Sequence, residues 1–216
     1  MPWEQADRFT VGAVDRPATL RRKAVTGPRA VRVPCGSQLK RFFAPSALVL
    51  PADASAPPSA AGFRLDQDGT AGHLICSVDA PQDGNGERRY RVRDDRGEEI
   101  GSVCRGQVQK RLVQHPWRIE QPGLPPVVAR YHWAKGTPKE IIERGVGNVL
   151  GSVADSLLSF GAEGGDSSPR PVTWRAAGTA VMTCEWGDDY GYKAYTLLSA
   201  ILDRRLAFAL AVLRDE

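Results

Sequence analysis

The stretch LAFALAVL, residues 206–213, decides the fold of this chain of 216 residues. Every residue in it is Leu, Ala, Phe or Val, so a helix formed here has no polar face and must be buried on all sides. The charged triplets DRR (203–205) and RDE (214–216) flank it. The run is much shorter than the roughly 20 residues that a bilayer-spanning helix needs. We therefore predict a core helix over residues 199–214.

Most of the remaining chain reads as short β-strands separated by Gly, Asp and Pro turns. The clearest hairpin joins 89–93 to 99–104 through the turn DDRG (94–97), with inward positions on a period of two. Regularly spaced short strands of this kind indicate an antiparallel barrel or sandwich, so the expected fold is mainly β. Further strands are expected at 62–65, 73–78, 117–120, 127–133, 172–176, 179–185 and 190–197.

One segment breaks the β pattern and predicts an inserted amphipathic helix over residues 138–160. The sequence TPKE (137–140) supplies an N-cap threonine, a proline suited to the first helical turn and a glutamate that completes a capping box. Apolar residues then recur at steps of three and four until Gly161. Such a stripe either packs on the barrel or contacts lipid or another helix.

Composition and charge bound the function without defining it. Hydrophobic residues make up 42% and charged residues 25%, which is the balance of a globular protein. The net charge is +4. An early basic excess forms either a solvated face or a surface for an anionic partner, and no nucleic-acid-binding signature accompanies it. We expect an arm over residues 1–27, with one strand at most, and a barrel domain over 28–216. The early basic residues are Arg21, Arg22, Lys23, Arg29, Arg32, Lys40 and Arg41.

No catalytic pattern stands out, so we expect a protein that is not an enzyme and that uses no cofactor or metal. Its three histidines accompany no nucleophile elbow, and the pairs Asp94-Asp95 and Asp188-Asp189 sit in expected turns. None of the four cysteines forms a C-x-x-C pair, which argues against a zinc or redox motif and for buried, reduced thiols. The first ten residues form no apolar signal sequence, so a cytoplasmic location is expected.

The order of three segments resembles the tubby C-terminal-like superfamily, which includes the tubby proteins, the phospholipid scramblases and the LURP-one-related proteins. The segments are RYRVRDDRGEEIGSVCR (89–105), PWRIE (116–120) and ILDRRLAFALAVLRDE (201–216). The likeness is greatest to the LURP-one-related and scramblase-like branch. It implies a closed antiparallel barrel of about 12 strands around a central, hydrophobic C-terminal helix, which solves how the apolar segment is buried.

The resemblance implies a non-enzymatic binding or regulatory module that engages an anionic lipid surface or a protein partner. The expected protein is then cytoplasmic and peripheral at the membrane, with no transmembrane segment. The alternative is a structural or interaction protein that forms a homo-oligomer, or docks on a larger complex, through the inserted helix 138–160. The candidate surface residues are Arg21, Arg22, Lys23, Arg130, Lys135, Val146, Val149, Val153 and Leu157.

Overall fold

The protein is mainly β in its computed structural model, which describes residues 2–36, 42–52, 62–67, 73–84, 86–106, 117–131, 171–186 and 192–215. The predicted helix 138–160 lies outside these residues. The described part contains a short 3-10 helix, η1 (Trp3–Gln5), the helix α3 (Arg204–Arg214) and the strands β1 (Arg8–Arg16), β2 (Val25–Cys35), β3 (Phe42–Pro51), β4 (Phe63–Gln67), β5 (Leu74–Val78), β6 (Gln82–Gly84), β7 (Glu87–Arg93), β8 (Glu99–Gly106), β9 (Trp117–Glu120), β10 (Val127–Tyr131), β11 (Val172–Ala176), β12 (Thr179–Trp186) and β13 (Lys193–Leu197).

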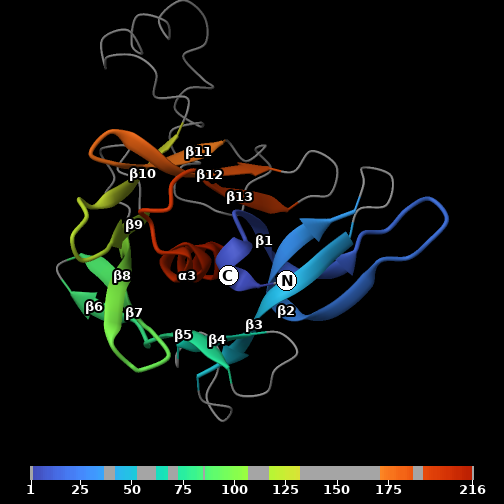
Figure 1. The fold of residues 1–216 in the computed structure, drawn as a ribbon, viewed down its shortest axis with the longest axis horizontal. Helices are drawn as coiled ribbons and strands as arrows, with labels where there is room; N and C mark the ends of the chain where they lie inside the picture. The colour runs from blue at the N-terminus through green and yellow to red at the C-terminus, as the bar shows by residue number, and fades with distance from the viewer. Residues whose placement is uncertain are drawn as a thin grey trace, which may run out of the picture.

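Twelve of these strands form a closed antiparallel barrel (Figure 1). The ring runs β5-β4-β3-β2-β1-β13-β12-β11-β10-β9-β8-β7, and the pairing of β5 with β7 closes it, while β6 lies on β7 outside the ring. The closing seam is short, with only the pairs Ser77↔Arg93 and Val78↔Val92. It is reinforced by Asp79, whose amide donates to the carbonyl of Arg91 at 2.9 Å and whose carboxylate pairs with Arg93 at 3.2 Å.

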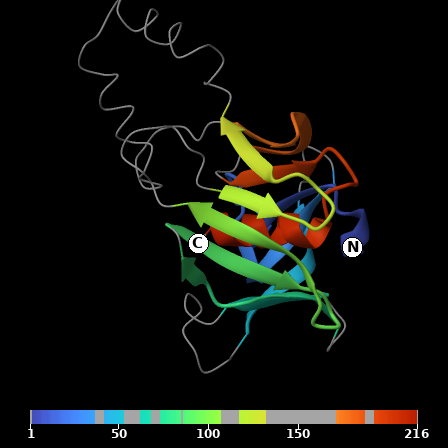
Figure 2. The ribbon, with the colours of Figure 1, turned by 90° about the vertical axis from the view of Figure 1, so that its left-hand side faces the viewer.

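Helix α3 runs through the middle of the barrel, where strands surround it in both views (Figures 1 and 2). Every residue from Leu206 to Val212 has 0% exposed surface, which confirms the predicted burial. The predicted helix begins five residues too early, because Asp203 is the N-cap and its side chain accepts from the amide of Arg205 at 2.9 Å. Residues 199–203 form the turn that leads into the lumen.

The wall contacts the helix through aromatic rings and at one glycine. Phe208 of α3 meets Phe9 of β1 edge-on at 4.7 Å between ring centroids, and Phe9 stacks on Tyr195 of β13 at 5.4 Å. On β8, Gly101 has a φ of 151°, and a Cβ atom there would lie 2.3 Å from the carbonyl oxygen of Glu120 and 3.0 Å from Leu206. Only glycine fits this close approach.

The N-terminal segment belongs to the barrel wall. The sequence predicts an arm over residues 1–27 and a barrel domain over 28–216, whereas β1 lies between β2 and β13 and forms part of the wall. The alternating pattern is hard to see there because register shifts interrupt the β1–β2 pairing between Gly12 and Val14 and between Val14 and Arg16. Strand β2 also contains two prolines, Pro28 and Pro34, which weaken the strand signal.

A charge placed on the central helix tests its burial. We expect Phe208→Asp to abolish the cooperative unfolding transition, because the carboxylate would be desolvated with no partner. The milder Phe208→Ala is expected to lower the free energy of unfolding by about 3–5 kcal/mol, measured by urea denaturation. Leu198→Ala is the control, because Leu198 is 52% exposed. A Phe208→Asp protein that melted like the wild type would contradict the central helix.

Candidate functional site

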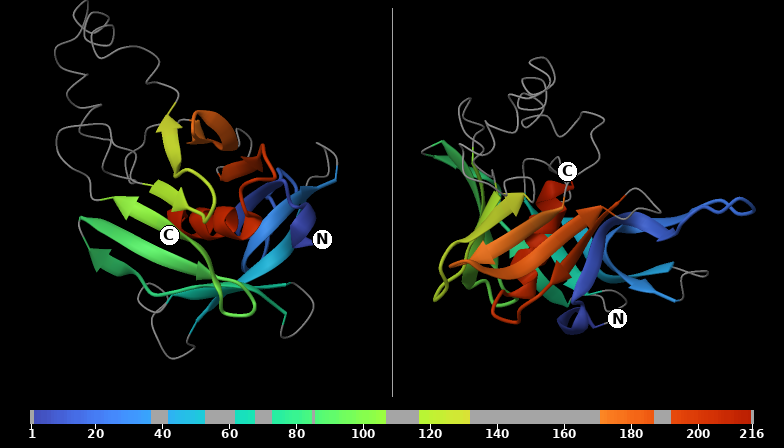
Figure 3. Two further views of the ribbon diagram at one scale, coloured as in Figure 1. Left: turned by 60° about the vertical axis from the view of Figure 1, so that its left-hand side comes forward. Right: turned by 90° about the horizontal axis from the view of Figure 1, so that it is seen from above.

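The most distinctive surface feature is the tip of the β1–β2 hairpin, which projects sideways from the barrel (Figure 3, right). Strand pairing runs outward to Arg16↔Val25 and resumes at an isolated bridge between Thr19 and Arg22. The amide of Thr19 donates to the carbonyl of Arg22 at 2.8 Å, and the reverse bond measures 3.2 Å. Residues 18–26 are all exposed. We call residues 19–23 the hairpin tip.

The hairpin tip carries charge of one sign. It contains Arg21, Arg22 and Lys23 in succession, all exposed. No acidic residue occurs in the sequence between Asp15 and Asp53. Like charges held this close repel one another and attract an anionic surface. The structure therefore places Arg21, Arg22 and Lys23, a basic trio, at the end of a projecting hairpin.

A buried arginine braces the hairpin where it leaves the barrel. Arg32, 1% exposed, pairs with the carboxylate of Asp15 across the hairpin. Its guanidinium group donates to the carbonyl oxygens of Gly12 at 2.9 Å, Pro28 at 2.7 Å and Phe43 at 3.3 Å. These bonds tie β1, β2 and β3 together. The prediction that Arg32 belongs to the exposed basic excess is thus wrong, because its side chain is buried and its charge is paired with Asp15 at the hairpin base.

Two further observations support the brace. A Cβ atom at Gly27 would lie 2.7 Å from Oδ2 of Asp15, so the glycine leaves room for the Arg32–Asp15 pair. The half-buried Arg29 donates to the carbonyl of Val212 at 2.9 Å and so links the hairpin base to the last turn of α3. A positive group at this position also interacts favourably with the C-terminal end of the helix dipole. The hairpin is therefore fixed to the wall and to the central helix.

The other candidate residues do not join the hairpin tip. Arg130 is exposed on β10, and three strands, β11, β12 and β13, separate β10 from β1 in the barrel wall. The remaining candidates stay predictions, because they lie outside the described residues: Lys135, Val146, Val149, Val153 and Leu157.

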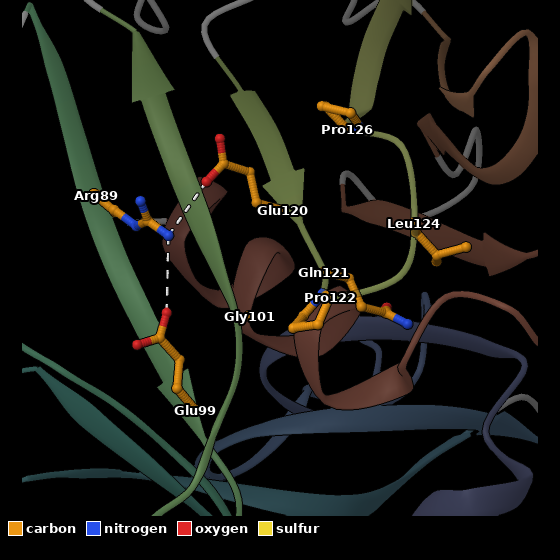
Figure 4. Close-up of a pocket in the computed structure, with 8 residues that line it drawn as sticks. All are labelled: Arg89, Glu99, Gly101, Glu120, Gln121, Pro122, Leu124 and Pro126. Carbon is orange, nitrogen blue, oxygen red and sulfur yellow. Dashed lines mark ion pairs between the residues drawn. The ribbon is translucent and has the colours of Figure 1, made fainter.

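A second surface feature is an open pocket of about 330 Å³ beside β8 and β9 and the turn that follows β9 (Figure 4). Arg89 lies between two carboxylates in it, 3.3 Å from Glu120 and 3.8 Å from Glu99. Glu120 also pairs with Arg118 at 2.8 Å. The lining residues are Arg89, Glu99, Gly101, Glu120, Gln121, Pro122, Leu124 and Pro126.

The polar groups of this pocket are largely engaged with one another and with the backbone. The side chain of Gln121 donates to the carbonyl of Ile201 at 3.0 Å and accepts from the amide of Asp203 at 2.9 Å, so it holds the turn before α3. The lining residues include no Ser, Cys or His that could act as a nucleophile or base. The arrangement suits a structural ion-pair network better than a site for chemistry.

The cysteines of the described residues have the environment of packed thiols. Cys76, Cys104 and Cys184 are buried, as predicted, whereas Cys35 is half-buried. Burial raises the pKa of Cys76 to about 12 and also raises the pKa of Cys104 and of Cys184. A thiol with such a pKa stays protonated at neutral pH and is a poor nucleophile.

Within the described ranges, no three His, Cys, Asp or Glu side chains come together as metal ligands. The same residues include no helix with the length and apolar character to cross a membrane.

Comparisons with protein-family models, with curated proteins and with solved structures find no match to this chain. Its own architecture therefore defines its class: a closed antiparallel barrel of twelve strands around an apolar helix, with a braced basic hairpin on its wall.

The thiol environments predict selective labelling. In the native protein we expect a thiol reagent to modify Cys35 rapidly and the three buried cysteines slowly, and all four rapidly after denaturation. Absorbance with an aromatic disulfide reagent measures both. Cys35→Ser should remove the rapid phase. Rapid native labelling that persisted in Cys35→Ser would mean that a buried thiol is accessible.

Proposed function

We propose that this chain is a tubby-like, non-enzymatic binding module that engages an anionic lipid surface through the hairpin tip. The observation that carries the proposal is the braced hairpin, which holds Arg21, Arg22 and Lys23 away from the barrel. The closed barrel around a C-terminal helix agrees with the architecture that the resemblance to the tubby C-terminal-like superfamily implies.

The charge of the hairpin tip sets the expected strength of binding. Each Lys or Arg near an acidic bilayer surface contributes about 1 kcal/mol, so three contribute about 3 kcal/mol. That gain weakens as salt rises, because the screening length falls from about 10 Å at 0.1 M to about 3 Å at 1 M ionic strength. Because the tip projects, its three charges reach the bilayer surface before the barrel does. The binding is therefore reversible and salt-sensitive.

Co-sedimentation with vesicles tests the proposal. We expect the protein to bind vesicles of phosphatidylcholine and phosphatidylserine at low salt, to release them at high salt, and to ignore phosphatidylcholine alone. Replacement of Arg21, Arg22 and Lys23 by alanine is expected to weaken binding on the order of 100-fold.

The control removes the same charge elsewhere, by replacing Arg8, Arg96 and Arg175, all exposed, with alanine. It should bind almost as tightly as the wild type. If both triple variants lost vesicle binding equally, net charge alone would explain the binding, and a specific role for the hairpin tip would be overturned. If the wild-type protein bound no acidic vesicle in any salt, the lipid surface would be rejected and a protein partner would take its place.

A further inference from the structure

Leu20 at the apex of the hairpin tip has a relative exposure of 108%. The next most exposed large hydrophobic side chain of the described residues is Leu198, at 52%. Leu20 and Arg21 are the two central residues of the turn closed by the Thr19–Arg22 bridge. Two-residue hairpin turns favour Gly, Asn or Asp at these positions. A leucine here packs against nothing in the barrel and is not a residue that favours the backbone conformation of the turn.

The neighbours of Leu20 make this exposure informative. Single exposed apolar side chains are common on protein surfaces and need no explanation by themselves. This one, however, stands directly before Arg21, Arg22 and Lys23, on a hairpin whose base is fixed by Arg32. A leucine at the apex, with positive charges beside and behind it, matches the layers of an acidic bilayer, in which anionic headgroups cover an apolar interior.

We propose that Leu20 inserts below the headgroups of an acidic bilayer while Arg22 and Lys23 contact the lipid phosphates. This inference rests on the proposed function and specifies how the hairpin tip holds the membrane. The dimensions agree. Strand residues rise about 3.3 Å each, so Arg22 and Lys23 lie roughly 3–7 Å behind the apex. The headgroup layer on each side of a bilayer is about 5–7 Å thick.

The two parts of the tip then depend differently on salt. Binding through Arg21, Arg22 and Lys23 weakens with ionic strength, whereas transfer of a leucine side chain out of water is almost independent of it. Full burial of a leucine strengthens binding on the order of 30-fold. Nucleic acid offers phosphates without an apolar layer behind them, so a tip that bound nucleic acid would gain little from Leu20.

Substitutions at the apex test the insertion. We expect Leu20→Ala to weaken binding to vesicles containing phosphatidylserine about tenfold, Leu20→Asp to weaken it further, and Leu20→Phe to bind like the wild type. Leu20→Trp should gain a fluorescence component, relative to the wild-type protein, that lipids brominated along the acyl chain quench. Leu198→Ala is the matched control, because Leu198 is exposed away from the hairpin tip, and it should bind like the wild type.

The outcomes separate this inference from the proposed function. If the wild type bound acidic vesicles through its charges, but Leu20→Ala and Leu20→Asp bound equally well and Leu20→Trp showed no quenching, insertion would be overturned and surface binding would stand. If the wild type bound no acidic vesicle, both would fall. Binding to duplex DNA that exceeded vesicle binding and did not change in Leu20→Ala would also reject both.

Discussion

The burial of one apolar helix is the constraint on which the structure depends. A helix with no polar face must be enclosed, and α3 is enclosed by wall on all sides. A barrel of about eight strands is just wide enough for its own side chains to fill. Twelve strands leave a wider lumen, and a helix about 10–12 Å across with its side chains occupies it. The ring of strands and the helix therefore stabilise each other, since each buries the apolar surface of the other.

Enclosure of the helix also positions the hairpin tip. Arg29 connects the hairpin base to the last turn of α3, and Arg32 fixes the same base to β1 and β3. These contacts lie where the hairpin leaves the wall, so the direction of the projection is set by packed structure. A flexible loop with the same three charges would lose more conformational entropy on binding a surface. The fold thus supports the function that we propose by preorganising the tip.

Strands with clean alternation and standard turns could be predicted from the sequence. The bounds of β9 and β11 agree with the predicted 117–120 and 172–176, and the DDRG turn joins β7 to β8 as expected. The part of the barrel wall formed by β1, β2 and β3 could not be predicted, because bulges and prolines interrupt the alternation of apolar and polar residues in these strands. Tertiary pairing with β13 and β4 makes these segments strands despite their weak local pattern.

The candidate site was predictable only in part. The basic trio is visible in the sequence, but the role of Arg32 depends on the strand register that brings Gly12, Asp15 and Phe43 around it. The exposure of Leu20 also requires the turn to be known, since an isolated leucine before two arginines reads equally well as part of a strand. The one signal in PATLRRK (17–23) is the lack of a second large apolar residue at strand spacing, since the residues two positions from Leu20 are Ala18 and Arg22.

The order of the strands has a consequence for biosynthesis. Strand β1 pairs with β13, so one edge of β1 has no partner until β13 is synthesised about 185 residues later. The helix that fills the lumen, residues 204–214, is synthesised after β13. The emerging chain must therefore carry apolar strand faces in water until β13 and α3 have been synthesised. Chains dominated by such distant pairings fold slowly and aggregate readily. This protein should accordingly depend on chaperones during synthesis more than a helical protein of equal length does.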